Sequence, residues 1–255
     1  MTSPILVTGG TGKLGRHVVP LLREAGHDVR VLSRRSKDPL DGVEYVSVDL
    51  LDGDGLAGAL DGVTTVLHLA GANKGDDKAT ANLVEAARRT GEVEHLVHVS
   101  VIAADKLPIG WFRSKYAAEQ AVIGSGIPWT VLRPAQFHDI VWDMVTAMAK
   151  MPVFPAPGGL RFQPVDIREV AERLVGLALD KPAGLVPDLA GPKVYHLSEL
   201  GRGYLQARGK RRLMLPVRMP GKVGRAYRAG ENLNLDAAVV GGRTWEEFLA
   251  ERVER

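Results

Sequence analysis

The sequence predicts an α/β fold in which a doubly wound parallel sheet carries helices on both faces, followed by a smaller C-terminal lobe. Two observations predict it. Short β-branched stretches alternate with amphipathic helical segments of about 10 to 15 residues over the amino-terminal two-thirds of the chain. A glycine-rich turn also follows the first of these stretches directly. We expect residues 1–150 to form the sheet domain and residues 151–255 the smaller lobe, joined as one continuous structural unit.

The elements follow from hydrophobic periodicity. Strands are expected over 5–7, 29–32, 44–48, 63–69, 96–99 and 129–132, and helices between them over 13–25, 78–90 and 112–124. Beyond Pro134 the alternation weakens, although residues 167–179 still have a helical pattern. A last helix is expected over 245–252, with Thr244 as its N-cap and Glu247 completing a capping box.

Composition excludes several classes of protein. The 255 residues are 45% hydrophobic and 25% charged, which is typical of a globular chain. The net charge of +3 does not favour a nucleic-acid partner, and the absence of cysteine excludes disulfides, thiolate metal sites and a cysteine nucleophile. The histidines have no metal-ligand spacing, and no apolar run reaches the roughly 18 residues of a membrane span. We expect a cytoplasmic protein with no metal and no membrane partner.

The glycine-rich turn is the first candidate binding element. It runs Thr8-Gly9-Gly10-Thr11-Gly12-Lys13-Leu14-Gly15, so that three glycines stand three residues apart between a strand and a helix. The first glycine permits a tight turn, the second lets a pyrophosphate approach the backbone, and the third lets the helix pack closely. The amino end of the helix offers free N–H groups to the phosphates. This pattern predicts a dinucleotide site, against the alternative of a purely structural turn.

The end of the second strand indicates which dinucleotide binds. Enzymes that use NAD place an acid about 20 residues after the turn, to bond the ribose 2′-OH. Here the strand ends in Ser33-Arg34-Arg35, without an acid. Two guanidinium groups can pair with a 2′-phosphate, which a carboxylate would repel. We therefore expect NADP(H) in preference to NAD(H), the alternative being two solvated surface arginines.

These segments, taken in order, resemble the atypical short-chain dehydrogenase/reductases, in the NmrA-like branch of NAD(P)-binding proteins with a Rossmann fold. The resemblance covers essentially the whole chain. It rests on the glycine turn and on these further segments: Leu32–Arg35, Val48–Leu50, His68–Gly71, His98–Ser100, Leu132–Phe137 and, more loosely, Val165–Ala171 and Thr244–Leu249.

The resemblance implies further cofactor contacts. Asp49 and Leu50 would bracket the adenine, and Ala70 and Gly71 would line the ribose and pyrophosphate. Pro134, Gln136 and Phe137 would line the nicotinamide site. For Asp49 a plain capping role is the alternative. Thr8, Ser33, Ser100 and Pro134 are expected to surround one crevice beyond the carboxyl ends of the strands.

One position departs from the resemblance. Active members carry Tyr-x-x-x-Lys on the helix after the fifth strand. Here Lys115 is present but position 111 is Trp. The indole of tryptophan has no proton that it can release near neutral pH. Tyr116 cannot replace the missing tyrosine, because adjacent helical residues point about 100° apart. Lys115 is expected to contact the nicotinamide ribose, or else to be an exposed helix lysine. Ser100 is a candidate polar catalytic group, or else bonds the backbone beside the cofactor.

Loss of the tyrosine acid slows reduction of a simple ketone but matters less for an acceptor whose reduced anion is delocalised. The first hypothesis is therefore an NADPH-dependent oxidoreductase acting on a quinone-like or conjugated small molecule. The alternative is a non-catalytic NADP(H)-binding regulator that acts through a protein partner. Residues 201–230 carry nine cations and no acid. We expect the stretch from Arg202 to Arg228 to form a solvated flap over the substrate cleft, the alternative being contact with nucleic acid or an acidic partner. Substrate specificity is expected from the loops around 154–162 and 202–228.

Overall fold

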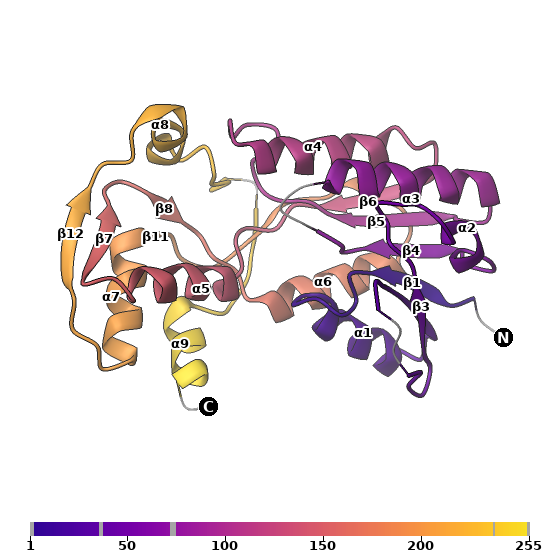
Figure 1. Ribbon diagram of the computed structural model, residues 1–255, viewed down its shortest axis with the longest axis horizontal. Coiled ribbons are helices and arrows are strands. Elements are labelled where there is room, and N and C mark those ends of the chain that lie inside the picture. Colours follow the sequence, from indigo (N-terminus) through magenta and orange to yellow (C-terminus); the bar gives the residue numbers. More distant parts are fainter. Residues whose placement is uncertain (1–2, 36–37, 72–74, 237, 254–255) are drawn as a thin grey trace. The chain divides into compact units, whose positions relative to one another are not determined.

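The protein is described by a computed structural model that covers residues 3–35, 38–71, 75–236 and 238–253 (Figure 1). The chain divides into two compact units. The first unit comprises Met1–Ser100, Arg113–Leu132 and Val170–Val186. The second comprises Val101–Phe112, Arg133–Glu169 and Pro187–Arg255. The chain therefore passes between the units several times, and the simple division at residue 150 stays a prediction.

The first unit is built on a parallel sheet. Over the described residues it has seven strands in the order β3-β2-β1-β4-β5-β6-β9, each parallel to its neighbours. The strands are β1 (Ile5–Thr8), β2 (Val29–Ser33), β3 (Val43–Ser47), β4 (Thr65–His68), β5 (His95–Val99), β6 (Trp129–Leu132) and β9 (Gly184–Leu185). This order is that of a doubly wound dinucleotide-binding sheet, so the predicted fold class is confirmed.

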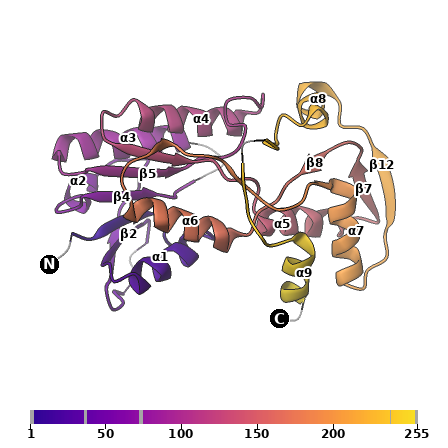
Figure 2. The same cartoon turned by 180° about the vertical axis from the view of Figure 1, so that it is seen from behind.

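Helices cover both faces of this sheet. They are α1 (Gly15–Glu24), α2 (Leu56–Ala59), α3 (Asp76–Thr90), α4 (Gly110–Ile123) and α6 (Ile167–Leu179). Figures 1 and 2 show α3 and α4 on one face and α1 and α6 on the other. On the α3 side, buried side chains of the strands pack against the helices, for example Val66 and Leu96 against Leu83 and Val122. Alternation along the strands sends every second residue into this core.

The second unit has short paired strands and four helices within the described residues. The pairs are β7 (Val153–Pro157) with β12 (Leu213–Val217), β8 (Arg161–Phe162) with β11 (Tyr195–His196), and β10 (Leu189–Ala190) with β13 (Val239–Val240). The helices are α5 (His138–Met148), α7 (Leu197–Ala207), α8 (Gly221–Ala229) and α9 (Trp245–Val253). Their shared core contains Phe154, Tyr204 and Trp245, all almost completely buried. Residues 201–230 thus form parts of α7, β12 and α8 rather than a continuous flap.

The last helix begins as predicted. The backbone N–H of Thr244 donates to Glu247 Oε2 at 2.7 Å, and the N–H of Glu247 donates to Thr244 Oγ1 at 3.3 Å. This reciprocal pair is the predicted capping box. In the described part of the chain, every helix is too short or too polar to cross a membrane.

Candidate functional site

The candidate site lies where the parallel strands of the first unit end. Thr8, Ser33 and His68 are the last residues of β1, β2 and β4, and neighbouring strands run in register. Their carboxyl ends therefore meet at one edge of the sheet, where ligands bind in open α/β folds.

The glycine turn has the geometry that its residues require. Gly9 has a φ of +68°, and a Cβ there would lie 2.7 Å from the backbone nitrogen of Ala70. A Cβ on Gly15 would lie 2.3 Å from the carbonyl oxygen of Gly9, so the start of α1 rests directly on the turn. Gly12 is exposed. Because α1 begins at Gly15 and not at the expected Lys13, the turn also includes Lys13 and Leu14.

The two arginines follow β2 at the same edge of the sheet. Arg34 and Arg35 are both exposed, whereas Ser33 is buried and its Oγ accepts the N–H of Arg35 at 3.3 Å. Ser33 therefore shapes the turn after the strand, and both guanidinium side chains extend beyond it into solvent.

Asp49 and Leu50 follow β3. The Asp49 carboxylate accepts the N–H of Leu51 at 2.9 Å, the local turn contact that aspartate commonly makes. Asn82 on α3 donates its amide to the carbonyl of Leu50 at 2.8 Å. This loop is thus held by α3. The contact of Asp49 with Leu51 matches the capping role that was the alternative to adenine binding.

Lys115 is buried and not an exposed helix lysine. Its Nζ lies 2.7 Å from Oδ2 of Asp76, and the two side chains are 10% and 5% exposed. Asp76 opens α3, and its neighbour Asp77 accepts a hydrogen bond from Ser114 at 3.1 Å. The first turn of α3 therefore holds α4 at two adjacent positions.

The ion pair lies beside Gly71. A Cβ on Gly71 would be 2.7 Å from Lys115 Nζ and 3.8 Å from Asp76 Oδ2. Gly71 is itself exposed, so the lysine lies under a surface position that has no side chain to cover it. The ammonium group is thereby held next to the loop that the sequence assigns to the ribose and pyrophosphate.

A chain of hydrogen bonds links the glycine turn to α3 through His68. The N–H of Ala70 donates to Thr8 Oγ1 at 3.1 Å, and Thr8 Oγ1 lies 2.6 Å from His68 Nδ1. On the other side of the ring, His68 Nε2 lies 2.9 Å from Thr80 Oγ1, which donates to the carbonyl of Asp76 at 2.7 Å. Because the single proton of Thr80 goes to that carbonyl, His68 must donate from Nε2 and accept from Thr8 at Nδ1.

His68 is therefore neutral with its proton on Nε2. Burial, helped by the nearby charge of Lys115, lowers the pKa of His68 to about 3. The imidazole of His98 stacks on it with ring centroids 5.1 Å apart. The pKa of His98 also lies well below its ordinary value, mainly because of burial and also because of the nearby charge of Lys115. Lys115 is thus close enough to this histidine row to act on it electrostatically.

Beyond His68, the stacked histidine pair His68–His98 leads to polar atoms that have no hydrogen-bond partner in the part of the chain that the structure describes. Both ring nitrogens of His98 and Oγ of Ser100 are buried without a hydrogen-bond partner among the described residues. The backbone N–H of Ser100 continues the sheet by donating to Leu132 at 2.9 Å. The ring of His68 is satisfied by hydrogen bonds on both sides, whereas within the described ranges the ring nitrogens of His98 are not. Buried polar groups without a partner are rare and require an explanation such as a ligand.

The predicted nicotinamide wall belongs to the second unit. Pro134 bridges to Leu189, Phe137 is the N-cap of α5, and the carbonyl of Gln136 accepts the N–H of Val165 at 3.0 Å. The side-chain amide of Gln136 is buried, with no hydrogen-bond partner in the described ranges.

Trp111 and Tyr116 both lie on α4. Trp111 is in its first turn and meets Phe112 edge to face at 4.9 Å between ring centroids, whereas Tyr116 is exposed. The position that would hold a tyrosine acid is therefore an aromatic packing position.

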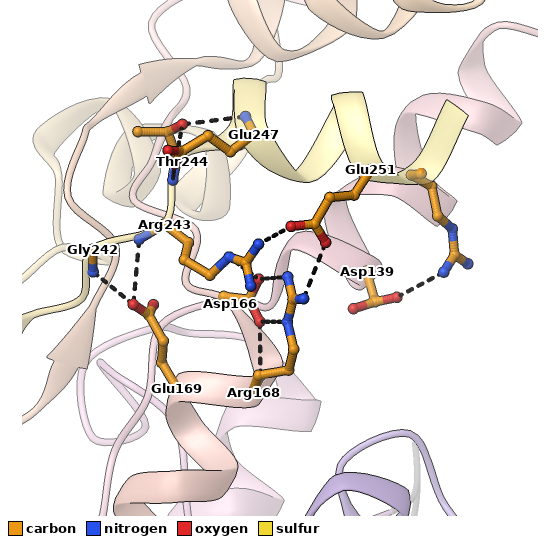
Figure 3. Close-up of polar contacts among 10 residues, drawn as sticks. Asp139, Asp166, Arg168, Glu169, Gly242, Arg243, Thr244, Glu247 and Glu251 are labelled. Atoms are coloured by element: carbon orange, nitrogen blue, oxygen red, sulfur yellow. Dashed lines mark hydrogen bonds and ion pairs between the residues drawn. The ribbon is translucent and has the colours of Figure 1, made fainter. Parts of the chain in front are cut away.

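The last two segments of the resemblance, Val165–Ala171 and Thr244–Leu249, take part in structural contacts. Figure 3 shows Asp166 between Arg168 and Arg243, with Glu251 of α9 paired to both arginines. Asp166 is almost fully buried; burial raises its pKa, but hydrogen bonds from Arg168 and the charges of both arginines outweigh burial and lower it. Glu169 accepts the N–H of Gly242 at 2.6 Å. These contacts fasten the last helix and the residues before it to the start of α6.

The first 150 residues decide the family. Residues 9–150 match the NAD(P)H-binding family over more than half of the chain. The chain belongs to this family. This confirms the resemblance drawn from the sequence at the level of an NAD(P)H-binding protein.

Three of the relatives have names that describe an enzymatic activity. Over 139 residues the chain is 39% identical to the (4-alkanoyl-5-oxo-2,5-dihydrofuran-3-yl)methyl phosphate reductase of Streptomyces griseus, covering 52% of this chain and 48% of that protein. It is 28% identical to an NAD(P)H azoreductase of Xenophilus azovorans, covering 81% and 74%. It is 26% identical to quinone oxidoreductase 2 of Escherichia coli, covering 81% and 75%. The match thus spans about half the length of the first relative.

A solved structure has the same fold. The NADPH-dependent quinone oxidoreductase of Escherichia coli, in complex with NADPH, superposes with a TM-score of 0.80 at 19% identity. The superposition covers 97% of this chain and 99% of the other. At this identity the likeness establishes the doubly wound fold alone.

The residues present fit a nicotinamide dinucleotide. Gly12 is exposed on a turn whose tight path depends on Gly9 and Gly15, because a Cβ at either position would clash with the backbone of Ala70 or of Gly9; such a glycine turn before a helix is the usual binding element for a pyrophosphate. The unsatisfied Ser100 hydroxyl lies at the same edge of the sheet. A nucleotide with an anionic pyrophosphate and a hydroxylated ribose is the kind of ligand that these groups accommodate.

Several residues of the site were not predicted. Asp76, Asp77, Thr80 and Asn82 hold Lys115, Ser114, His68 and the Leu50 loop, and all four lie in the first two turns of α3. The spacing of Asp76 and Thr80 carried a usable signal, because residues four apart lie on one helix face. It could not indicate which partners that face would meet.

Proposed function

We propose that this chain is an NADPH-dependent oxidoreductase that passes hydride to a quinone-like or otherwise conjugated acceptor without a tyrosine acid. The observation that carries the proposal is the buried pair of Lys115 and Asp76, 2.7 Å apart beside the exposed Gly71. An ammonium group is costly to bury, so a lysine held at this sheet edge by a dedicated carboxylate suggests a binding role.

Each predicted residue has a task in this proposal. The turn from Thr8 to Gly15 binds the pyrophosphate through its N–H groups and the amino end of α1. Arg34 and Arg35 bind the 2′-phosphate, which makes NADPH the preferred cofactor. Lys115 donates to the hydroxyls of the nicotinamide ribose, and Asp76 keeps it in that position.

The choice of acceptor follows from Trp111. When bound, NADPH supplies a hydride, and the acceptor must also gain a proton. Trp111 cannot supply one, so an acceptor whose reduced anion is delocalised, and which takes its proton from water, suits this site best. The three relatives support this choice, because their names describe reduction of a quinone, an azo compound and an unsaturated furanone.

A second candidate is a non-catalytic NADP(H)-binding regulator that acts through a protein partner. The same Trp111 favours it, since a nucleotide sensor needs no proton donor. The regulator and the enzyme share the cofactor site and differ only in turnover.

The test is NADPH oxidation with a panel of one quinone, one azo dye, one unsaturated lactone and one simple ketone. We expect turnover with at least one conjugated acceptor and little with the ketone. Lys115→Met should lower kcat/KM by about tenfold or more, because a hydrogen bond from a charged donor contributes about 1.5–3 kcal/mol. Lys78→Met, an exposed lysine of α3, is the matched control and should leave the rate unchanged.

The outcomes separate the candidates. Tight NADPH binding without turnover of any acceptor would overturn the enzyme and support the regulator. Failure to bind any nicotinamide nucleotide would reject both. Reduction of the simple ketone as fast as the quinone would contradict the role assigned to Trp111.

A further inference from the structure

The strand pair β7–β12 in the second unit has two chemically different faces. Alternate residues of a strand point to opposite sides. Phe154 and Ala156 of β7 are buried, and Met214 of β12 packs against the core of the unit. A Cβ on Gly201 of α7 would lie 2.5 Å from the Phe154 ring, so the helix backbone lies directly against this inner face.

The opposite face is entirely apolar. The register pairs Val153 with Leu213, Pro155 with Leu215, and Pro157 with Val217, so these six side chains form one continuous surface. We call this the outer face of β7–β12. Leu213 is 71% exposed and Leu215 is 44% exposed. Adjacent exposed leucines on one strand face are uncommon on a soluble surface and mark a contact site.

Cations flank this face along the chain, and acids are missing from the segments that form it. Residues 144–165, which contain β7, carry two cations and no acid, and residues 201–230, which contain β12, carry nine cations and no acid. Lys210, Arg211 and Arg212 immediately precede β12, and Arg218 immediately follows it; all four are exposed. Within the described ranges, none of the nine cations of residues 201–230 has a carboxylate at ion-pair distance.

We propose that the outer face of β7–β12 and its flanking cations bind peripherally to the surface of a membrane that contains anionic lipid. Exposed aliphatic side chains enter the boundary between headgroups and acyl chains, while arginine and lysine remain with the phosphates. The inference goes beyond the proposed function and does not depend on it.

Three other partners fit the same surface less well. A second copy related by two-fold symmetry would bring the same cations against each other. An added peptide strand needs free N–H groups along a strand edge, but β7 and β12 contain Pro155, Pro157 and Pro216, which have none. Single-stranded nucleic acid needs aromatic platforms for base stacking, and the outer face is aliphatic.

The experiment is sedimentation of the whole protein with two kinds of vesicle, pure phosphatidylcholine and phosphatidylcholine mixed with phosphatidylglycerol. We expect binding to the anionic vesicles alone, and its loss at high salt because the Debye length shrinks from about 10 Å to a few ångströms. The double variant Leu213→Ser with Leu215→Ser should reduce the apparent affinity at least about fivefold. The double variant Lys210→Gln with Arg211→Gln should also weaken binding and reduce its salt dependence.

Matched controls are Leu235→Ser, another exposed leucine of the second unit, and Arg88→Gln with Lys181→Gln, two exposed cations of the first unit. Both should bind as the parent chain does. The proposal is overturned by equal binding of the leucine variant and its control, by equal binding to neutral vesicles, or by no binding. A dimer that the leucine variant dissociates would assign the face to a second copy instead. No nucleotide is present in the assay, so its result is independent of NADPH turnover.

Discussion

Each unit contains buried charge, but the two sites are satisfied to different degrees. In the second unit, Asp166 is enclosed by Arg168 and Arg243, and Glu251 completes the cluster. In the first unit, Lys115 and Asp76 form a pair close to His98, whose ring nitrogens have no hydrogen-bond partner in the described part of the chain. A saturated cluster fixes one element to another. A cluster beside unsatisfied donors and acceptors has capacity left for a ligand.

The largest expected effect concerns the saturated cluster. Asp166→Asn should lower the free energy of unfolding by about 3 kcal/mol, because it removes the carboxylate that two arginines share. Urea denaturation measures this difference. The control is Lys193→Ala, which removes an exposed ion pair with Glu246 in the same unit and should cost less than about 1 kcal/mol. Equal losses in the two variants would contradict the structural role of the cluster.

A smaller effect is expected from the histidine row when the pH falls. The pKa of His68 is about 3 in the folded protein, and an unfolded histidine titrates near 6.5. The unfolded chain therefore binds more protons, and stability declines as the pH drops below about 6.5. At pH 5, His68 alone should account for about 2 kcal/mol of this decline.

The His68→Gln variant checks this value. It keeps one donor and one acceptor, and its loss of stability between pH 7 and pH 5 should be about 2 kcal/mol smaller than that of the parent chain. His17→Gln, an exposed histidine of α1, should retain the parent's full decline. An unchanged pH dependence in the His68 variant would show that the ring is not held neutral.

The smallest effect concerns the exposed arginines. Arg34→Ala with Arg35→Ala should weaken NADPH binding about tenfold, because contacts of solvated charges to a phosphate are individually modest. NADH binding should change less than about twofold in the same titration. Equal weakening of both nucleotides would refute the assignment of these residues to the 2′-phosphate.

Much of the first unit could be predicted because its strands and glycines are determined locally. The six predicted strands are β1 to β6, with ends shifted by only a residue or two, and α6 was predicted with its observed ends. The glycine turn was equally accessible, because Gly9 and Gly15 are required by contacts within a few residues or with the adjacent strand. Hydrophobic periodicity and the glycines that close backbone packing requires can both be recognised from the residue types alone.

The elements of the second unit, and the ion pair that holds Lys115, could not be predicted in this way. The helices α5, α7 and α8 were missed because proline and glycine interrupt their surroundings and the strands between them are short. The pairing of Lys115 with Asp76 joins residues on two different helices, and no periodicity reports such a contact. The same holds for the pairing of Val153 with Leu213, which brings together segments sixty residues apart in the chain.

The path of the chain between the units has a consequence for synthesis. The central sheet takes its last strand, β9, from Gly184–Leu185, and α6 reaches its face from residues 167–179. A nascent polypeptide therefore cannot complete this sheet until about residue 186 has left the ribosome, by which time a large part of the second unit has already emerged. Long-range pairing of this kind slows folding. We expect a fragment that stops at residue 150 to depend on chaperones and to aggregate, since it would expose the edge of β6 and the part of the sheet face that α6 covers.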